Sequence, residues 1–314
     1  MTGIQRFMRR TAWVLLIGLV PVVAHGAERP DWAFPVADKV QPPSKDDDQP
    51  KSLSGSTKSY TQQQIDDLKN PPDWLPDMHP PMPPVVAQGT ATFACGSCHL
   101  PIGTGHDESA YLAALPSSYI VSQMADFKSG TRKGFGLMPD IAQALSDADV
   151  QAAAAYFTSL AARPWVRVVE TDTVPKTYVN PGNMRLALPS GGSEPIGSRI
   201  VELPENEAAA VARDPRSGFI AYVPKGSIAK GQVLVTTGGG ETTACVICHG
   251  PTLKGVGTTP AIAGRHTGYI VRQLYFFQNG SRSGPAEALM HNVVQRLNDD
   301  DMVGIAAYLA SREP

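Results

Sequence analysis

The feature that most constrains this 314-residue chain is an internal repeat. Residues 94–99 read Ala-Cys-Gly-Ser-Cys-His and residues 244–249 read Ala-Cys-Val-Ile-Cys-His, an offset of 150 residues. The same offset relates Tyr119-Ile-Val to Tyr269-Ile-Val further along the chain. Self-similarity at a fixed offset is typical of duplicated structural units. The sequence therefore predicts two copies of one domain, each of roughly 75–85 residues.

The two motifs contain all four cysteines of the chain, and a histidine directly follows each pair: Cys95, Cys98 and His99, then Cys245, Cys248 and His249. The Cys-x-x-Cys-His pattern is the signature of c-type haem attachment. Two thiols on one helical turn can each add to a vinyl group of one haem, and the next residue, His, is placed to ligate the iron. The sequence therefore predicts two covalently bound haem c groups, which would also supply core bulk in a chain with only 7% aromatic residues.

Other uses of paired cysteines fit less well. A structural zinc site needs four ligands, and each copy offers two Cys and one His, plus at most an unmatched His106 or His266. A thioredoxin-like redox pair disagrees with the histidine after each pair and with the helical rather than βαβ surroundings. Two disulfides in an exported protein would leave the repeated histidine without an explanation.

Each copy resembles a class I cytochrome c domain, and the tandem is similar to the two-haem cytochromes c of the bacterial periplasm. In that family the haem motif is followed by a Tyr-containing helix, a Gly turn, a Met ligand and a C-terminal helix. The resemblance covers about 85–163 and 229–314, and it places the Tyr helices at 117–129 and 267–279. It implies a mostly α fold and a role in electron transfer.

Met138 and Met290 are the predicted sixth ligands of the two irons. They follow the first cysteine of their motifs by 43 and 45 residues, so they occupy equivalent places in the two copies. A thioether sulfur suits a low-spin iron of raised potential. Met124 and Met302 have no methionine counterpart in the other copy, which favours a core role for them. His291, next to Met290, is the alternative ligand in the second copy.

The resemblance also implies groups around each haem. In the family a backbone carbonyl holds the iron-ligating His, and Pro260 stands at that place in the second copy, whereas the first copy has Ala110. Arg265 and Arg272 are candidates to pair with haem propionates in the second copy, with a surface charge as the alternative for both.

The first 27 residues read as an export signal. Arg6, Arg9 and Arg10 precede an apolar run at 11–23, and small residues follow at 24–27. A run of about 13 residues is shorter than the roughly 20 that a spanning helix needs. We therefore expect a periplasmic protein whose membrane association occurs only through partners or an uncleaved signal.

The predicted fold is mostly α: two class I cytochrome c domains in tandem, a short-strand insert between them and an extended Pro-rich N-terminal arm. Twelve of the 28 prolines fall in residues 28–90, which favours an extended arm. The predicted units are the signal at 1–27, the arm at 28–84, the first domain at 85–163, the insert at 164–228 and the second domain at 229–314.

Charge and site chemistry together favour a carrier of single electrons. Twenty-seven Lys and Arg against 29 Asp and Glu leave no basic excess for nucleic acid. The predicted partners are redox proteins: a periplasmic donor, such as a dehydrogenase, and a respiratory acceptor, such as an oxidase or a smaller cytochrome. A cytochrome subunit of a dehydrogenase complex, docking through the arm and the insert, has the same chemistry.

The alternative function is a dihaem enzyme, peroxidase-like or acting on a small molecule, with one labile axial ligand. Such an enzyme needs an acid–base residue near an open iron position. His106, His266 and His291 are the candidates, and the sequence favours surface or propionate-side positions for all three.

Overall fold

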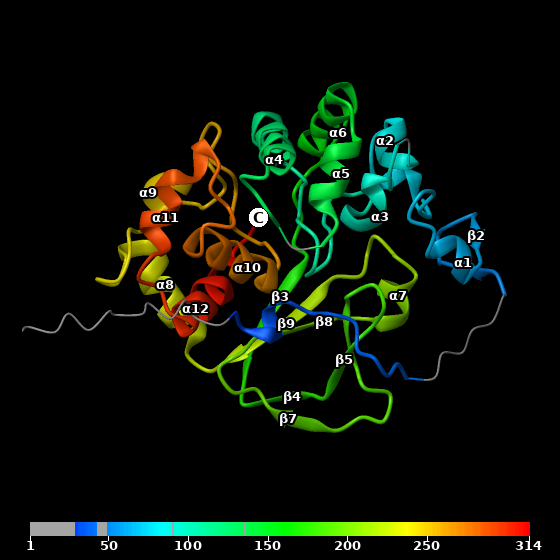
Figure 1. Ribbon diagram of the computed structural model, residues 1–314. Coiled ribbons are helices and arrows are strands. Elements are labelled where there is room, and N and C mark those ends of the chain that lie inside the picture. The colour runs from blue at the N-terminus through cyan, green and yellow to red at the C-terminus, as the bar shows by residue number, and fades with distance from the viewer. Residues whose placement is uncertain (1–28, 43–48, 90, 135) are drawn as a thin grey trace, which may run out of the picture.

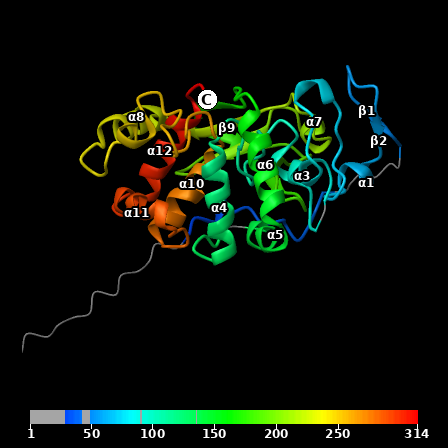
Figure 2. The ribbon, with the colours of Figure 1, turned by 90° about the horizontal axis from the view of Figure 1, so that it is seen from above.

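The computed structural model describes residues 29–42, 49–89, 91–134 and 136–314, so the predicted export signal lies outside it. Two helical halves stand side by side over a small set of strands (Figure 1). The view from above separates the same two halves, with α8, α11 and α12 on one side and α3, α5 and α6 on the other (Figure 2). None of the helices in the described ranges is long and apolar enough to cross a membrane.

The first half is a bundle of short helices around one apolar core. Its helices are α2 (Pro84–Ala87), α3 (Cys95–His99), α4 (Ser117–Ser129), α5 (Met138–Ala144) and α6 (Asp147–Ser159). Helix α6 begins at Asp147 because the Ser146 side chain accepts a hydrogen bond from the Asp149 amide, the usual N-cap contact. Helix α4, which packs on α5 and α6, coincides with the predicted Tyr helix.

The second half repeats this plan with a longer entry helix. Its elements are α8 (Ser227–Thr237), α9 (Val246–His249), α10 (Thr267–Gln278), the 3₁₀ turn η3 (Pro285–Glu287), α11 (Ala288–Val294) and α12 (Asp299–Ala310). Helices α8 and α12 cross in close contact at Gly231 and Gly304. A Cβ atom at Gly231 would clash with the Gly304 carbonyl oxygen, so this crossing requires glycine.

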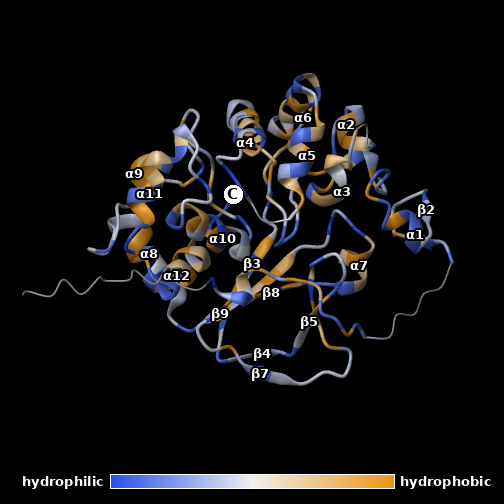
Figure 3. Ribbon diagram, in the orientation of Figure 1, coloured by the Kyte–Doolittle hydropathy of each residue, from blue (hydrophilic) through white to orange (hydrophobic). Residues whose placement is uncertain are grey.

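Seven short strands lie between the two halves in the sequence and beneath them in space. β3 (Val166–Thr171), β9 (Phe219–Pro224) and β8 (Val201–Pro204) form one sheet in the order β3-β9-β8, with β3 parallel and β8 antiparallel to β9. The three strands of this sheet are largely hydrophobic (Figure 3), and burial is greatest in β8, where all four residues are buried, and in β9, where every second residue is. The remaining elements are β4 (Thr173–Pro175), β5 (Thr177–Val179), β6 (Arg185–Ala187), α7 (Glu207–Val211) and β7 (Ser193–Pro195).

The N-terminal arm packs against both helical halves and against the insert between them. It contains the 3₁₀ turns η1 (Asp31–Ala33) and η2 (Pro76–Met78), the strands β1 (Lys51–Ser52) and β2 (Ser59–Tyr60), and the helix α1 (Gln62–Ile65). Phe34 joins the core of the second half. Trp74 is 2% exposed, and its Nε1 donates to the Ala212 carbonyl at 2.7 Å, next to α7. Met78 packs against the core of the first half, so the arm also links the insert to that half.

Candidate haem sites

The first motif forms the short helix α3, which brings Cys95 and Cys98 onto one turn. Both thiols are free of disulfide bonds. Burial raises the pKa of Cys95 to about 12 and also raises that of Cys98. Burial thus favours the neutral thiol form of both side chains.

His99 ends this helix and is held in one orientation. Its Nδ1 lies 2.8 Å from the Ala110 carbonyl oxygen, and because a carbonyl only accepts, Nδ1 carries the proton. Burial lowers the pKa of His99 to about 4, so the ring is neutral. The lone pair is then on Nε2, the arrangement that a metal-ligating imidazole needs. In the first copy, the Ala110 carbonyl thus takes the role that the resemblance assigns to the Pro260 carbonyl in the second copy.

One cavity brings the predicted first site together. It has a volume of about 950 Å³, and its lining includes Cys95, Cys98, His99 and Met138. Met138 reaches it from the first residue of α5. The apolar part of the lining includes Leu115, Ile120 and Phe157, as a flat hydrophobic cofactor requires.

The second motif repeats the histidine contact of the first. His249 ends α9, and its Nδ1 lies 2.8 Å from the Pro260 carbonyl oxygen. Burial lowers the pKa of His249 and raises that of Cys245 to about 11. Cys245 and Met290 both pack against the core of the second half. His291 instead is exposed, and its Nδ1 donates to the Phe277 carbonyl at 3.0 Å.

The surroundings of Arg265 show whether the chain can accommodate the propionates of a haem. Its side chain is 4% exposed and lies 4.2 Å over the ring of Tyr111, yet none of its three guanidinium nitrogens has a hydrogen-bond partner among the described residues. Burial lowers the pKa of Arg265 to about 10, so it stays charged at neutral pH. An unpaired buried cation is costly. The site therefore fits an anionic group such as a haem propionate.

The alternative of a surface charge for Arg265 and Arg272 is wrong. Arg272 is 1% exposed, its Nη1 donates to the Ala33 carbonyl at 2.7 Å, and its Nη2 donates to the Asp107 carbonyl. The protein itself thus satisfies Arg272, which ties the arm to both halves. Of these two arginines, Arg265 is the one whose guanidinium nitrogens have no partner in the part of the chain that the structure describes.

A surface position is also wrong for His266, which is fully buried. Its Nδ1 hydrogen-bonds to the Glu202 carboxylate, and its Nε2 lies 3.1 Å from the Thr104 carbonyl oxygen. Although burial opposes the charge, the Glu202 carboxylate raises the pKa of His266. This histidine therefore joins the insert and the first half to the second half and is not a candidate acid–base group.

His106 is buried as well, at 7% exposure, and it lines the first cavity. Its Nδ1 lies 3.1 Å from Glu108 Oε1, while its Nε2 has no hydrogen-bond partner among the described residues. Of the three histidines considered for an enzyme, His106 is the one that lines the cavity.

Sequence reasoning missed a set of polar residues between the two haem sites. Arg132 Nη2 donates to Gln273 Oε1 at 2.9 Å, and Arg282 Nη2 donates to Gln123 Oε1 at 2.8 Å. The two arginines occupy equivalent positions, as do the two glutamines. The signal was present, because the offset of 150 residues continues from the Tyr helices as far as Arg282.

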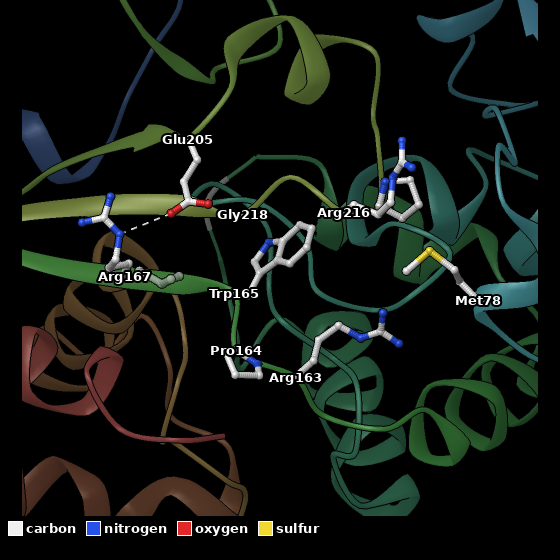
Figure 4. Close-up of a pocket in the computed structure, with 10 residues that line it drawn as sticks. Met78, Arg163, Pro164, Trp165, Arg167, Glu205, Arg216 and Gly218 are labelled. Carbon is white, nitrogen blue, oxygen red and sulfur yellow. Dashed lines mark hydrogen bonds and ion pairs between the residues drawn. The ribbon is translucent and has the colours of Figure 1, made fainter. Parts of the chain in front are cut away.

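A smaller pocket of about 360 Å³ lies where the first half meets the insert. Figure 4 shows Arg163, Trp165 and Arg216 around it, with Arg167 paired to Glu205 at 3.4 Å. None of the predicted haem-binding residues is among the described residues that line it. This pocket is therefore separate from the predicted haem chemistry.

Comparison with known families identifies each half separately. The family model described as cytochrome c matches residues 228–313, and the model for subunit III of cbb3-type cytochrome c oxidase matches residues 84–157. Each matched range contains one Cys-x-x-Cys-His motif.

Two curated relatives align with most of the chain. A thiosulfate dehydrogenase electron acceptor of Thiomonas intermedia (strain K12) is 30% identical over 222 residues, which cover 70% of this chain and 78% of that protein. Cytochrome c4 of Azotobacter vinelandii is 27% identical over 238 residues, covering 71% of this chain and 86% of that protein.

Two solved structures match the chain with TM-scores just below 0.5. A thiosulfate dehydrogenase from Marichromatium purpuratum is 29% identical with a TM-score of 0.48, covering 73% of this chain and 39% of that longer chain. Reduced cytochrome c4 from Pseudomonas stutzeri is 21% identical with a TM-score of 0.47, covering 69% of this chain and 93% of that one.

Proposed function

Because this chain belongs to the dihaem cytochromes c, we propose that it is exported and carries single electrons from a periplasmic dehydrogenase to a respiratory acceptor. That it is an electron-carrier cytochrome with covalently bound haem c, whose partners are redox proteins, follows from the family. The route, the location and the ligands are the proposal. The predicted signal at 1–27 supports export.

The proposed attachment and ligand sets are the same in the two halves. Cys95 and Cys98 would hold the first haem through thioether bonds, and His99 and Met138 would ligate its iron. Cys245, Cys248, His249 and Met290 would do the same in the second. When bound, haem c supplies an iron that exchanges one electron at a time. Each His offers Nε2 because its Nδ1–H is held by a carbonyl, and each Met offers a thioether sulfur that favours the reduced state.

The observation that carries this function is the duplicated His contact. Both imidazoles donate Nδ1–H to a carbonyl eleven residues later, at 2.8 Å in each copy. Two sites with the same His and Met pair leave no coordination position for a substrate. Oxidation and reduction are then what remains, and a tandem of two such sites suits transfer between two protein partners.

The names of the relatives support a particular donor. Two of them, from Thiomonas intermedia and Stutzerimonas stutzeri, are named thiosulfate dehydrogenase electron acceptors. We therefore propose a thiosulfate dehydrogenase as the donor class.

Visible spectroscopy of the purified holoprotein tests the function first. We expect neither carbon monoxide nor peroxide to change the spectra, because Met occupies the sixth position of each iron. We also expect a thiosulfate dehydrogenase with thiosulfate to reduce both haems, whereas thiosulfate alone does not. Binding of carbon monoxide, or turnover of peroxide, would contradict the carrier and favour the enzyme.

The enzyme alternative has one structural support, the unpartnered Nε2 of His106 in the first cavity. A His106→Gln variant separates the two functions. An enzyme that uses this ring as acid or base loses peroxide turnover, typically by 10²- to 10⁴-fold. A carrier keeps its rate of reduction by the donor.

A further inference from the structure

The two haem motifs differ in what covers them, although their sequences match. Ser97 and Ile247 occupy the same position, directly before the second cysteine of each motif. Ser97 is 1% exposed and Ile247 is 71% exposed. The neighbouring Cys98 is half-buried, whereas Cys248 is exposed. Ser97 and Cys98 of the first motif are therefore covered by protein, whereas Ile247 and Cys248 of the second motif face solvent.

Part of the cover over the first motif comes from the insert. Helix α7 and the residues that follow it contribute Ala210, Val211 and Arg213 to the cavity that holds Cys98. Arg213 Nη1 donates to the carbonyl oxygen of Ser97, so the guanidinium contacts helix α3 directly. The insert thereby brings a charged side chain to the first site from a position 116 residues away.

The backbone at Arg213 is held in an uncommon conformation to make this contact. Its φ is +59°, in the left-handed region that costs a non-glycine residue roughly 1–2 kcal/mol. Hydrogen bonds on both sides fix the turn: Arg213 N donates to the Ala210 carbonyl at 2.9 Å, and Asp214 N donates to the Ala209 carbonyl at 2.9 Å. The Trp74 bond to Ala212 anchors the same turn to the arm.

Arg213 is half-buried, so solvent screens its charge only in part. Burial lowers the pKa of Arg213, but an arginine remains protonated at neutral pH. Two carboxylates act electrostatically on this guanidinium: Asp66, which is exposed on the arm, and Glu108, which is paired with His106 at 3.1 Å. A fixed cation beside a redox centre stabilises its less positive state, and burial strengthens this interaction.

We propose that Arg213 raises the reduction potential of the haem at the first motif and so makes the two haems inequivalent. In the second motif the residue that corresponds to Ser97 is Ile247, which is 71% exposed. Two sites with the same ligands then differ in potential partly because the insert places Arg213 at the first of them. This inference rests on the proposed haem attachment at Cys95 and Cys98.

A redox titration of the holoprotein, fitted to two one-electron components, tests the proposal. In Arg213→Gln we expect the reduced-to-oxidised ratio of the first haem to fall about tenfold at a fixed solution potential, a shift of about 59 mV for one electron. The second haem should keep its potential. A Met290→His variant assigns the two components, because it changes a proposed ligand of the second iron only.

Arg216→Gln is the matched control, since it removes the same charge three residues away. Arg216 pairs with Asp214 at 2.7 Å and donates to the Ser54 carbonyl at 2.8 Å instead of to the first motif. We expect it to leave both potentials unchanged. A wild-type titration curve for Arg213→Gln, or the same shift in both arginine variants, overturns the proposal.

Arg213→Lys separates the charge from packing. It keeps a cation at the site, so we expect the reduction potential of the first haem to stay close to that of the wild type. A shift as large as that of Arg213→Gln overturns the electrostatic explanation. The mass of each intact variant reports haem content independently. If wild-type protein carries no haem at Cys95 and Cys98, the attachment proposal fails, which is distinct from two haems with unaltered potentials.

Discussion

Arg132 and Arg282, 150 residues apart in the sequence, pair as an isolated antiparallel bridge between the two helical halves. Each guanidinium stacks on the aromatic ring five residues before it, Phe127 or Phe277, with 4.4 Å from the guanidinium carbon to the ring centre in both cases. Arg282 also donates to the Tyr119 hydroxyl at 2.8 Å. Each of these two equivalent arginines thus contacts the other half, and together they fix the orientation of the halves.

Replacing Arg282 should weaken this interface. In Arg282→Met, the buried Glu287 carboxylate and the half-buried Tyr119 hydroxyl lose a donor, so we expect the free energy of unfolding of the holoprotein to fall by about 2–4 kcal/mol. Urea unfolding followed by circular dichroism measures the change. Arg312→Met is the control, because Arg312 is exposed and stacks only on Tyr308. Equal stabilities of the two variants would contradict an interface role for Arg282.

The methionine ligands can be tested by potential. Met138→His and Met290→His should each lower the potential of one haem, because imidazole favours the oxidised iron more than a thioether does. Spectroelectrochemical titration resolves the two components. Met124→Leu and Met302→Leu are matched controls, expected to leave both potentials near those of the wild type. A wild-type potential in Met138→His would remove Met138 from the ligand set.

Replacing Arg265 should change the free energy of unfolding in a direction that shows whether a propionate pairs with it. With a propionate partner, Arg265→Met leaves a buried anion unpaired, and the holoprotein should lose about 3 kcal/mol of unfolding free energy. Without such a partner, the substitution removes an unpaired buried cation and should stabilise the protein. Thermal unfolding of the holoprotein distinguishes these results. Arg312→Gln, at an exposed position, should change stability by no more than about 0.5 kcal/mol.

The buried Glu202–His266 pair predicts a pH dependence. Although burial opposes both charges, the partners lower the pKa of Glu202 and raise that of His266. The Glu202 contribution is fully present above its unfolded pKa of about 4.3 and is lost as the pH falls. The His266 contribution is fully present below about 6.5 and is lost as the pH rises through the folded pKa.

The pair therefore stabilises the fold most between about pH 4.3 and 6.5. We expect His266→Gln to cost about 3 kcal/mol in that window and less above it. Urea unfolding from pH 4 to pH 9 measures the difference from wild type. Asp147→Asn, which breaks the exposed Lys128–Asp147 pair, serves as the control with an effect below about 1 kcal/mol. A penalty for His266→Gln that is independent of pH would mean that the pair is not ionised.

The haem chemistry was readable from the sequence because its determinants are local or repeated. Cys95, Cys98 and His99 are neighbours on one helical turn, so their spacing alone indicates how they can act together. Met138 and Met290 stood out only because the repeat gave each an equivalent. Arg132 and Arg282 had the same kind of signal, but their pairing depends on how the halves meet.

The sequence by itself determined the duplicated domain, the attachment motifs and the candidate ligands, since each depends on short spacings along the chain. Tertiary structure alone decided which charged side chains are buried. It placed Arg265 without a partner, Arg272 on the arm, His266 on Glu202 and Arg213 on the first motif. These contacts join segments that are far apart in the sequence, and burial at such junctions is a property of the packed units that no local pattern encodes.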